Sequence, residues 1–200
     1  MSKAQSVIGS VAASGALVFV AMMALGASGG PTGVEVVPKP AEKRVDVLVD
    51  GKPFTAYVWP DRLKKPVLYP LRTAGDTTVT RGFPLDPRAG ERVDHPHHVG
   101  MWFNHGDVNG VDFWNNSEAL KPEAAAKMGT IYHRRIVSSR SGKEKGELEV
   151  AADWVMPDGS TVVKETTRFV FAGGEGRRSI DRVTTLAAAS GRVVFKDNKE

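Results

Sequence analysis

The sequence predicts an all-β protein, folded as an antiparallel β-sandwich. From residue 44 onward, apolar and polar residues alternate with a period of two, which is typical of half-buried strands. Glycine, proline, asparagine and aspartate separate these alternating segments at short intervals. Segments with helical periodicity are scarce, whereas a parallel nucleotide-binding sheet needs a helix between successive strands. Many short strands joined by turns favour a sandwich or a barrel.

The expected strands follow one another along the chain. Segments 44–50 and 54–59 alternate on either side of a glycine-containing turn, so the two are predicted to form a hairpin. A strong turn signal at 156–160 predicts a second hairpin. The other strands are expected at residues 67–72, 77–81, 147–155, 161–171, 178–186 and 192–195. Segment 117–127 is the one helical candidate, and Pro122 interrupts it.

The first 30 residues are expected to be a signal peptide or an N-terminal anchor. Lys3 supplies a positive charge, residues 7–25 are uncharged and mostly apolar, and small residues follow them. We therefore expect an exported protein, periplasmic or extracellular, that contacts a membrane only through residues 7–25 if they are not cleaved. Residues 31–43 are expected to be an extended linker, followed by the sandwich domain at 44–200.

The composition excludes several classes of site. The chain has 200 residues and no cysteine, so disulfides, thiol nucleophiles and thiolate-bound metals are excluded. Its net charge is +4, but the basic residues are spread along the chain without interleaved aromatic residues, so nucleic-acid binding is not expected. The sequence has no phosphate-binding glycine loop, and no cofactor is expected.

Residues able to carry chemistry concentrate between positions 94 and 114. Four of the five histidines fall within this segment, beside carboxylates, asparagines and two tryptophans. A polar loop with hydrogen-bonded histidines is the alternative for any single residue. For the cluster as a whole, a functional site is the favoured interpretation.

An extended strand over residues 97–105 would sort these side chains between two faces. His97 and His105 would lie on the face that suits the core. The other face would suit a concave surface that stacks on a sugar, and it would carry His98, Trp102 and Asn104. For Trp102 and Trp114, core packing is an equally open interpretation.

A metal site is the rival interpretation of the histidines. His95 and His97 would lie roughly 6.6 Å apart on one face of a strand that rises about 3.3 Å per residue. Cupin-type sites use such a pair, but they add a glutamate a few residues later, where this sequence has none. We therefore expect no tightly bound metal ion.

Several motifs also match a known family. They are the run 66–76, Val79-Thr80-Arg81, the run 94–98, Trp102, the run 106–110 and the run 112–114. This pattern resembles the bacterial PmoA-like family, exported proteins of unknown function that often carry the label "methane oxygenase PmoA". Val99 departs from the family, in which a basic residue is expected. The label is not taken as a function, because a membrane monooxygenase subunit needs several spanning helices and this chain has one apolar segment.

The resemblance implies a fold and an extent. It implies a large β-sandwich similar to the galactose-mutarotase-like sugar-active proteins, whose concave sheet carries histidines and a carboxylate. Members of the family continue beyond the position of Glu200, so the sandwich is expected to be incomplete at its C-terminus. An uncovered sheet edge would make the chain marginally stable or self-associating.

The leading hypothesis is an exported protein that binds, and in its enzymatic version processes, a carbohydrate or another hydroxyl-rich small molecule. In the enzymatic version His98 or His105 is the general acid or base, paired with Asp107 or with a carboxylate beyond residue 200. The residues expected to contact the ligand are Arg72, Arg81, His97, Trp102, Asn104, Asn109 and Trp114. The alternatives are a non-catalytic recognition or scaffold domain with the same surface, and a histidine-based metal-binding domain.

Overall fold

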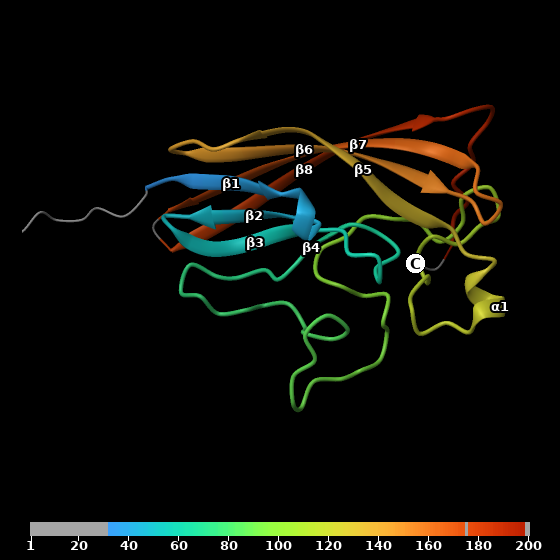
Figure 1. Ribbon diagram of the computed structural model, residues 1–200, viewed down its shortest axis with the longest axis horizontal. Coiled ribbons are helices and arrows are strands. Elements are labelled where there is room, and N and C mark those ends of the chain that lie inside the picture. Colours follow the sequence, from blue (N-terminus) through green and yellow to red (C-terminus); the bar gives the residue numbers. More distant parts are fainter. Residues whose placement is uncertain (1–31, 175, 199–200) are drawn as a thin grey trace, which may run out of the picture.

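The alternating segments form two four-stranded antiparallel sheets, so the prediction of an all-β sandwich is confirmed. The computed structural model describes residues 32–174 and 176–198. The sheets lie in two layers, with β1 to β4 in blue and cyan and β5 to β8 in gold to red (Figure 1). Side chains that alternate along the strands fill the space between the layers, as in other aligned sandwiches.

The first sheet contains the N-terminal strands in sequence order. They are β1 (Val34–Lys39), β2 (Arg44–Val49), β3 (Lys52–Val58) and β4 (Val67–Leu68). The first predicted hairpin is confirmed, because β2 and β3 pair antiparallel with Val45 opposite Tyr57. A short 3-10 helix, Pro40–Glu42, joins β1 to β2.

The linker expected at residues 31–43 is wrong for its central part. Residues 34–39 form β1, which pairs along its whole length with β2. Val34 and Val36 are buried against the second sheet, so burial of apolar surface stabilises this segment as a strand. Pro38 does not prevent the segment from forming a strand. Proline has no backbone amide to donate, but β1 is an edge strand and pairs with another strand of its sheet on one side only.

The second sheet contains four longer strands. They are β5 (Thr130–Arg140), β6 (Lys145–Val155), β7 (Thr161–Gly174) and β8 (Arg177–Ala188). The turn predicted at 156–160 is confirmed, because the amide of Met156 donates to the carbonyl of Ser160 at 2.8 Å. In β6, every second residue from Gly146 to Trp154 is buried, which is the pattern expected of a strand with one face on a core.

The main core lies between the two sheets. Its buried residues are Val34, Val36, Val45, Val47, Val49, Phe54, Tyr57, Leu68, Leu148, Val150, Phe169 and Phe171. Phe54 of the first sheet meets Phe171 of the second edge-on, with 6.3 Å between the ring centres. Cross-sheet contacts of this kind fix how the layers sit on each other.

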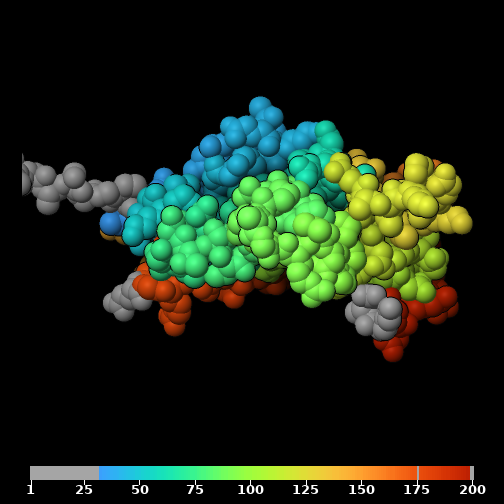
Figure 2. Space-filling view, turned by 90° about the horizontal axis from the view of Figure 1, so that it is seen from below, coloured from blue at the N-terminus to red at the C-terminus, as the bar shows by residue number. Residues whose placement is uncertain are grey.

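A long connection, residues 69–129, links β4 to β5 and carries the histidines. It runs below the first sheet and reaches the far end of the sandwich, where the short helix α1 (Pro122–Ala125) precedes β5 (Figure 1). Figure 2 shows this connection, green to yellow, covering much of the lower face. A second core cluster, which includes Phe113 of the connection and Trp154 of β6, attaches it to the second sheet.

Three sequence-based expectations fail in or near this connection. The strand expected at 67–72 is limited to Val67–Leu68, and residues 77–81 make only one isolated bridge, from Thr78. Val79 is 63% exposed, so the second segment buries no apolar face that would stabilise a strand. Residues 192–195 likewise make a single bridge, between Phe195 and Val108.

The helix expected at 117–127 is reduced to one turn. It begins at Pro122, which occupies the first helical position. Proline lacks the amide donor that a helix would need at an interior position, so it starts this helix instead of interrupting a longer one. The targeting segment expected at residues 1–30 lies outside the described residues. Within 32–174 and 176–198, no helix is long and apolar enough to span a bilayer.

Candidate functional site

The histidine segment is a turn and not the straight strand expected over 97–105. The amide of His98 donates to the carbonyl of His95 at 2.9 Å, which closes a tight turn. Gly100 has a φ of 59°, and a Cβ atom there would lie 2.2 Å from the carbonyl oxygen of Leu68. Its only backbone pairing with a named strand, among the described residues, is between Met101 and Leu68. The predicted division of the side chains between two strand faces is therefore wrong.

The turn gathers aromatic rings into one cluster. We call His95, His97, His98, Trp102 and Trp114 the histidine–tryptophan cluster. His98 stacks on Trp102 with 5.1 Å between ring centres and 24° between planes. It also stacks on His95 at 5.0 Å, and it meets His97 and Trp114 edge-on at 4.3 and 5.8 Å. Sequence reasoning placed four of these residues at the site, and the structure brings all five together.

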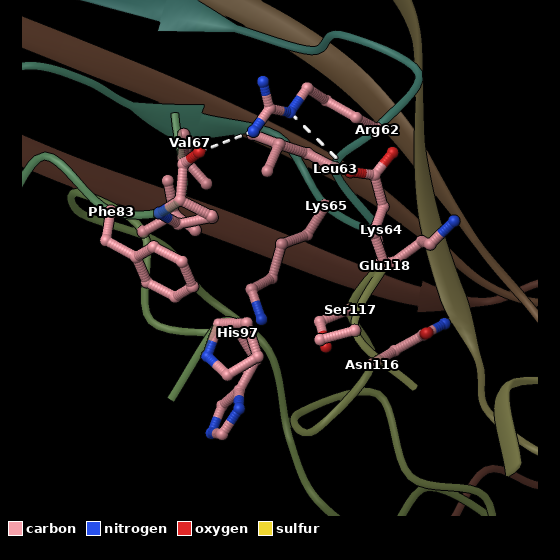
Figure 3. Close-up of a pocket in the computed structure, with 14 residues that line it drawn as sticks. Arg62, Leu63, Lys64, Lys65, Val67, Phe83, His97, Asn116, Ser117 and Glu118 are labelled. Atoms are coloured by element: carbon pink, nitrogen blue, oxygen red, sulfur yellow. Dashed lines mark hydrogen bonds and ion pairs between the residues drawn. The ribbon is translucent and has the colours of Figure 1, made fainter. Parts of the chain in front are cut away.

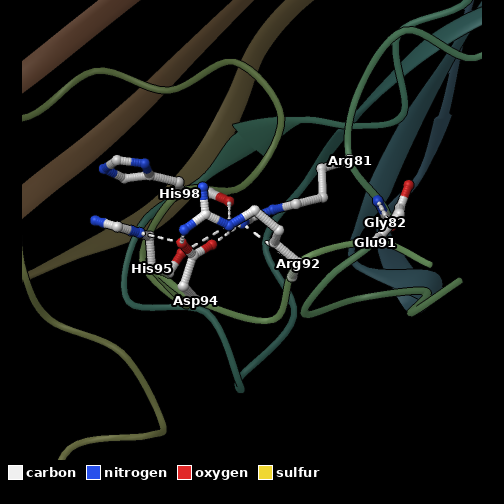
Figure 4. A network of polar contacts seen from close by, with 7 residues as sticks. All are labelled: Arg81, Gly82, Glu91, Arg92, Asp94, His95 and His98. Carbon is white, nitrogen blue, oxygen red and sulfur yellow. Dashed lines mark hydrogen bonds and ion pairs between the residues drawn. The ribbon is translucent and has the colours of Figure 1, made fainter. Parts of the chain in front are cut away.

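A network around Asp94 holds the histidine turn (Figure 4). The Asp94 carboxylate accepts from Arg81 at 2.9 Å, and it pairs with Arg92 at 3.0 Å and with Nδ1 of His95 at 3.2 Å. The other guanidinium nitrogen of Arg81 donates to the carbonyls of His95 and His98 at 2.9 and 3.3 Å. Arg81 therefore positions the backbone that presents the histidines.

A pocket of about 290 Å³ lies beside the cluster, and we call it the Lys65 pocket. The segment before β4, the loop at Phe83-Pro84, the histidine turn and residues 116–119 surround it (Figure 3). Lys65 is only 4% exposed, and its side chain extends toward His97. Its Nζ donates to the carbonyl of Trp114 at 3.1 Å and lies 5.6 Å from the centre of the Trp102 ring. Lys65 thus joins the pocket to the histidine–tryptophan cluster.

The surroundings lower the pKa values of two pocket residues, Lys65 and His97. Burial lowers the pKa of Lys65 to about 8, against the opposing effect of the Asp112 carboxylate. Burial, with smaller contributions from His98, Lys65 and His95, lowers the pKa of His97 to about 4. At neutral pH the pocket therefore holds an uncharged imidazole beside an ammonium group that remains mostly protonated.

The opposite wall of the pocket supplies further polar groups. The hydroxyl of Ser117 is buried and has no hydrogen-bond partner among the described residues. Asn116 donates through Nδ2 to the carbonyl of Gly129 at 2.9 Å and to Thr130 Oγ1 at 3.1 Å, which fixes this wall to the start of β5. Nε of Arg62 lies 3.7 Å from a carboxylate oxygen of Glu118 across the pocket rim.

A family model covers nearly all of the described chain. The model of a family of unknown function, DUF6807, matches residues 44–200. The chain belongs to the DUF6807 family. No curated protein and no solved structure matches it. The match does not bear on the resemblance to the PmoA-like family, which stays a prediction.

In this DUF6807 chain, two of the predicted catalytic residues lie against the C-terminal segment. His105 Nε2 is 2.8 Å from the carbonyl oxygen of Lys196, and its ring meets Phe195 edge-on. The Asp107 carboxylate accepts from the amide of Gly110 at 2.8 Å within a tight turn. The third predicted catalytic residue, His98, belongs to the histidine–tryptophan cluster. His98 thus contacts the rings of the histidine–tryptophan cluster, whereas His105 and Asp107 bond to other groups.

Three predicted ligand contacts bond to other groups of the protein instead. Asn109 accepts from the amide of Val194 at 2.8 Å and so holds the C-terminal segment. Asn104 is buried and donates to the carbonyl of Phe113 at 3.0 Å. Arg72 pairs with Asp76 at 2.9 Å across a turn, and it is not among the residues that line the Lys65 pocket.

The histidine pair considered for a metal comes close in this DUF6807 chain. The ring centres of His95 and His97 are 5.7 Å apart. Within the residues that the structure describes, no group of three or more histidine, aspartate or glutamate side chains is arranged to hold a metal ion.

Sequence reasoning missed Lys65 and Ser117. Lys65 lies in the run Arg62-Leu63-Lys64-Lys65-Pro66, which resembles an ordinary exposed basic segment. Ser117 follows two asparagines and has no neighbour in sequence that suggests a role. Segments that are distant in sequence cover these two side chains. No local sequence pattern in the DUF6807 chain therefore indicates that they are buried.

Proposed function

We propose that this protein binds a carbohydrate or another hydroxyl-rich small molecule in the Lys65 pocket. One observation carries the proposal. Lys65, His97 and Ser117 line a pocket whose other walls include apolar side chains such as Val67 and Phe83. Small-molecule sites combine apolar walls with a few polar groups in this way, and the volume of about 290 Å³ suits a single sugar unit.

The polar groups match the chemistry of a sugar. An uncharged imidazole and a hydroxyl can each donate or accept a hydrogen bond, as a sugar hydroxyl can. The buried Ser117 hydroxyl without a protein partner is unfavourable unless a ligand or water bonds to it. The apolar walls would contact the C–H groups of the sugar ring. A binding site is therefore the function that this geometry supports best.

The proposal is limited to binding. The catalytic pairing of His105 with Asp107 finds no support, because His105 bonds to Lys196 and the Asp107 carboxylate bonds to Gly110. Export through residues 1–30 is part of the proposal, and it rests on the sequence pattern of that segment.

Titration calorimetry with a panel of neutral and acidic monosaccharides tests the proposal. We expect at least one saturable ligand, and Ser117→Ala should weaken its binding about fivefold, the effect of one hydrogen bond. The matched control is Ser190→Ala, which removes the same group from an exposed turn and should leave binding unchanged. Absence of saturable binding, or binding that neither Ser117→Ala nor His97→Ala weakens, would contradict the proposal.

A further inference from the structure

We infer that the ligand of the Lys65 pocket carries a carboxylate, so that it is a sugar acid such as a uronate and not a neutral sugar. The inference rests on the proposed function and adds the charge of the ligand. It starts from the position of Lys65, whose ammonium group is buried at the pocket wall. Within the described residues, Lys65 makes no ion pair with a carboxylate.

A buried ammonium group needs compensation that this site only partly provides. Transfer of a charge from water into a protein is unfavourable unless the charge is paired and hydrogen-bonded. Lys65 has one carbonyl acceptor, from Trp114, and the face of the Trp102 ring. Its pKa of about 8, below the ordinary value of 10.5, agrees with an incompletely stabilised cation.

The carboxylate that acts electrostatically on Lys65 already has hydrogen-bond donors of its own. Asp112 acts electrostatically on Lys65, but its carboxylate accepts from the backbone amides of Trp114 and Asn115 at 2.6 and 3.0 Å. It also accepts from the Asn115 side chain at 2.7 Å. These bonds hold Asp112 in its own turn, so it does not close an ion pair with Lys65.

The other charges around the pocket are predominantly positive. Arg62, Lys64 and Lys65 line it, and Glu118 is the one acidic residue among the lining side chains of the described chain. Glu118 lies nearest to Arg62, at 3.7 Å, which leaves the two lysines without a carboxylate in the pocket. His97 is uncharged at neutral pH and adds no positive charge. A ligand carboxylate beside Lys65 would supply the missing counter-charge.

This arrangement predicts how the ligand lies. The carboxylate would sit at Lys65, next to the carbonyl of Trp114 that orients the ammonium group. The ring hydroxyls would face His97 and Ser117, which can exchange hydrogen bonds with them. Amide and ester derivatives keep the shape of a uronate but lose its charge, so they separate the charge requirement from the shape requirement.

The test compares matched acidic and neutral sugars on the full chain. Titration calorimetry at pH 7 would use D-glucuronate against D-glucuronamide, D-galacturonate against D-galacturonamide, and the parent sugars. We expect one acid to bind at least tenfold more tightly than its amide. Lys65→Met should reduce that preference to less than threefold, whereas the charge-matched control Lys143→Met, at an exposed turn, should preserve it.

The outcomes separate the two proposals. Equal binding of an acid and its amide would overturn the carboxylate inference and leave the sugar site standing. Absence of binding by every sugar would overturn the proposed function and the inference with it. If Lys65→Met does not fold, the wild-type pH profile decides, because the preference should decline progressively as Lys65 loses its charge above about pH 8. A preference that is unchanged between pH 7 and pH 10 would contradict a role for Lys65.

Discussion

Glu165 and Arg182 form an ion pair on the inner face of the second sheet, with 2.9 Å between Oε1 and Nη2. Glu165 also accepts from the Trp154 indole at 2.8 Å and from the Thr167 hydroxyl at 2.6 Å. The guanidinium group of Arg182 lies 4.8 Å from the centre of the Phe103 ring. Each charged group is therefore satisfied by several neighbours, and each depends on the other.

Glu165→Ala should destabilise the protein strongly, because it leaves Arg182 without its carboxylate. Removal of one partner from a buried pair costs about 3–5 kcal/mol in the free energy of unfolding. The matched control is Asp153→Ala, which breaks the more exposed pair with Arg134 and should cost less than about 1 kcal/mol. Urea unfolding measures both.

A second variant separates the charge effect from the loss of packing. Replacing both partners, as Glu165→Leu with Arg182→Leu, should cost less than the sum of the two single replacements. Strictly additive effects would show that Glu165 and Arg182 have no coupling free energy. A cost for Glu165→Ala no larger than that for Asp153→Ala would show that the buried pair is no more important for stability than the exposed one.

Three strands of the second sheet, β6 to β8, were predictable from their alternation. The strand β5 was not predicted, because irregularities interrupt its pairing with β6 and only one of its residues is buried. In β6, burial and apolar character alternate together from Gly146 to Trp154, apart from Ala151. In β7, burial alternates from Val163 to Phe171, although two of the buried residues, Glu165 and Thr167, are polar. The long connection was not predictable, since its conformation depends on distant partners. Met101 pairs with Leu68, and Asn109 bonds to Val194. Contacts of this kind leave no periodic pattern in either segment.

The candidate site was predictable only in part, and for the same reason. The density of histidines near Trp102 indicated the aromatic cluster, and the structure gathers those rings. The pocket beside them depends on the burial of Lys65, which follows from the folding of the connection over the end of β4. No residue next to Lys65 in sequence indicates that burial.

Gly100→Ala should disrupt the histidine turn. The added Cβ would lie 2.2 Å from the carbonyl oxygen of Leu68, and the φ of 59° is unfavourable for alanine. We expect a loss of more than about 2 kcal/mol in stability. The control is Gly90→Ala, at a φ of 81° with no atom within 4 Å of the new Cβ, which isolates the backbone effect from the clash. Equal melting temperatures of the two variants would contradict the proposed close contact.

The titration of Lys65 should be visible in the pH dependence of stability. Its pKa is about 8 in the folded protein and near the ordinary value of 10.5 in the unfolded chain. Between these values the unfolded state binds more protons, so stability should rise with pH across this range. His97, which faces Lys65, has a pKa of about 4 and stays uncharged over this range.

The comparison is with Lys65→Met, which keeps most of the side-chain stem and removes the titrating group. The difference in unfolding free energy between wild type and variant should change by about 3 kcal/mol from pH 8 to pH 10.5 in favour of the wild type. Below about pH 7 the difference should be constant. Parallel profiles of wild type and variant over the whole range would show that Lys65 has an ordinary pKa.

Asn109 should hold the C-terminal segment against the turn at residues 107–110. The backbone amide of Asn109 donates to the carbonyl of Val194 at 2.9 Å. In return, the amide of Val194 donates to Asn109 Oδ1 at 2.8 Å. Its Nδ2 donates to the carbonyl of Arg192 at 3.3 Å. Asn109→Ala removes both side-chain bonds, and alanine is also less favourable than asparagine at the φ of 52°.

Hydrogen exchange at the Val194 amide measures this anchor directly. In Asn109→Ala we expect exchange about tenfold faster, equivalent to about 1.4 kcal/mol in the opening free energy. Asn109→Asp keeps the acceptor for the Val194 amide and should preserve most of its protection. The amides of β6 and β7 should be unchanged in both variants, because the anchor lies outside the main core. If Val194 exchanges equally fast in wild type and Asn109→Ala, the side chain does not hold the segment, and Asn109 becomes available again as a ligand contact.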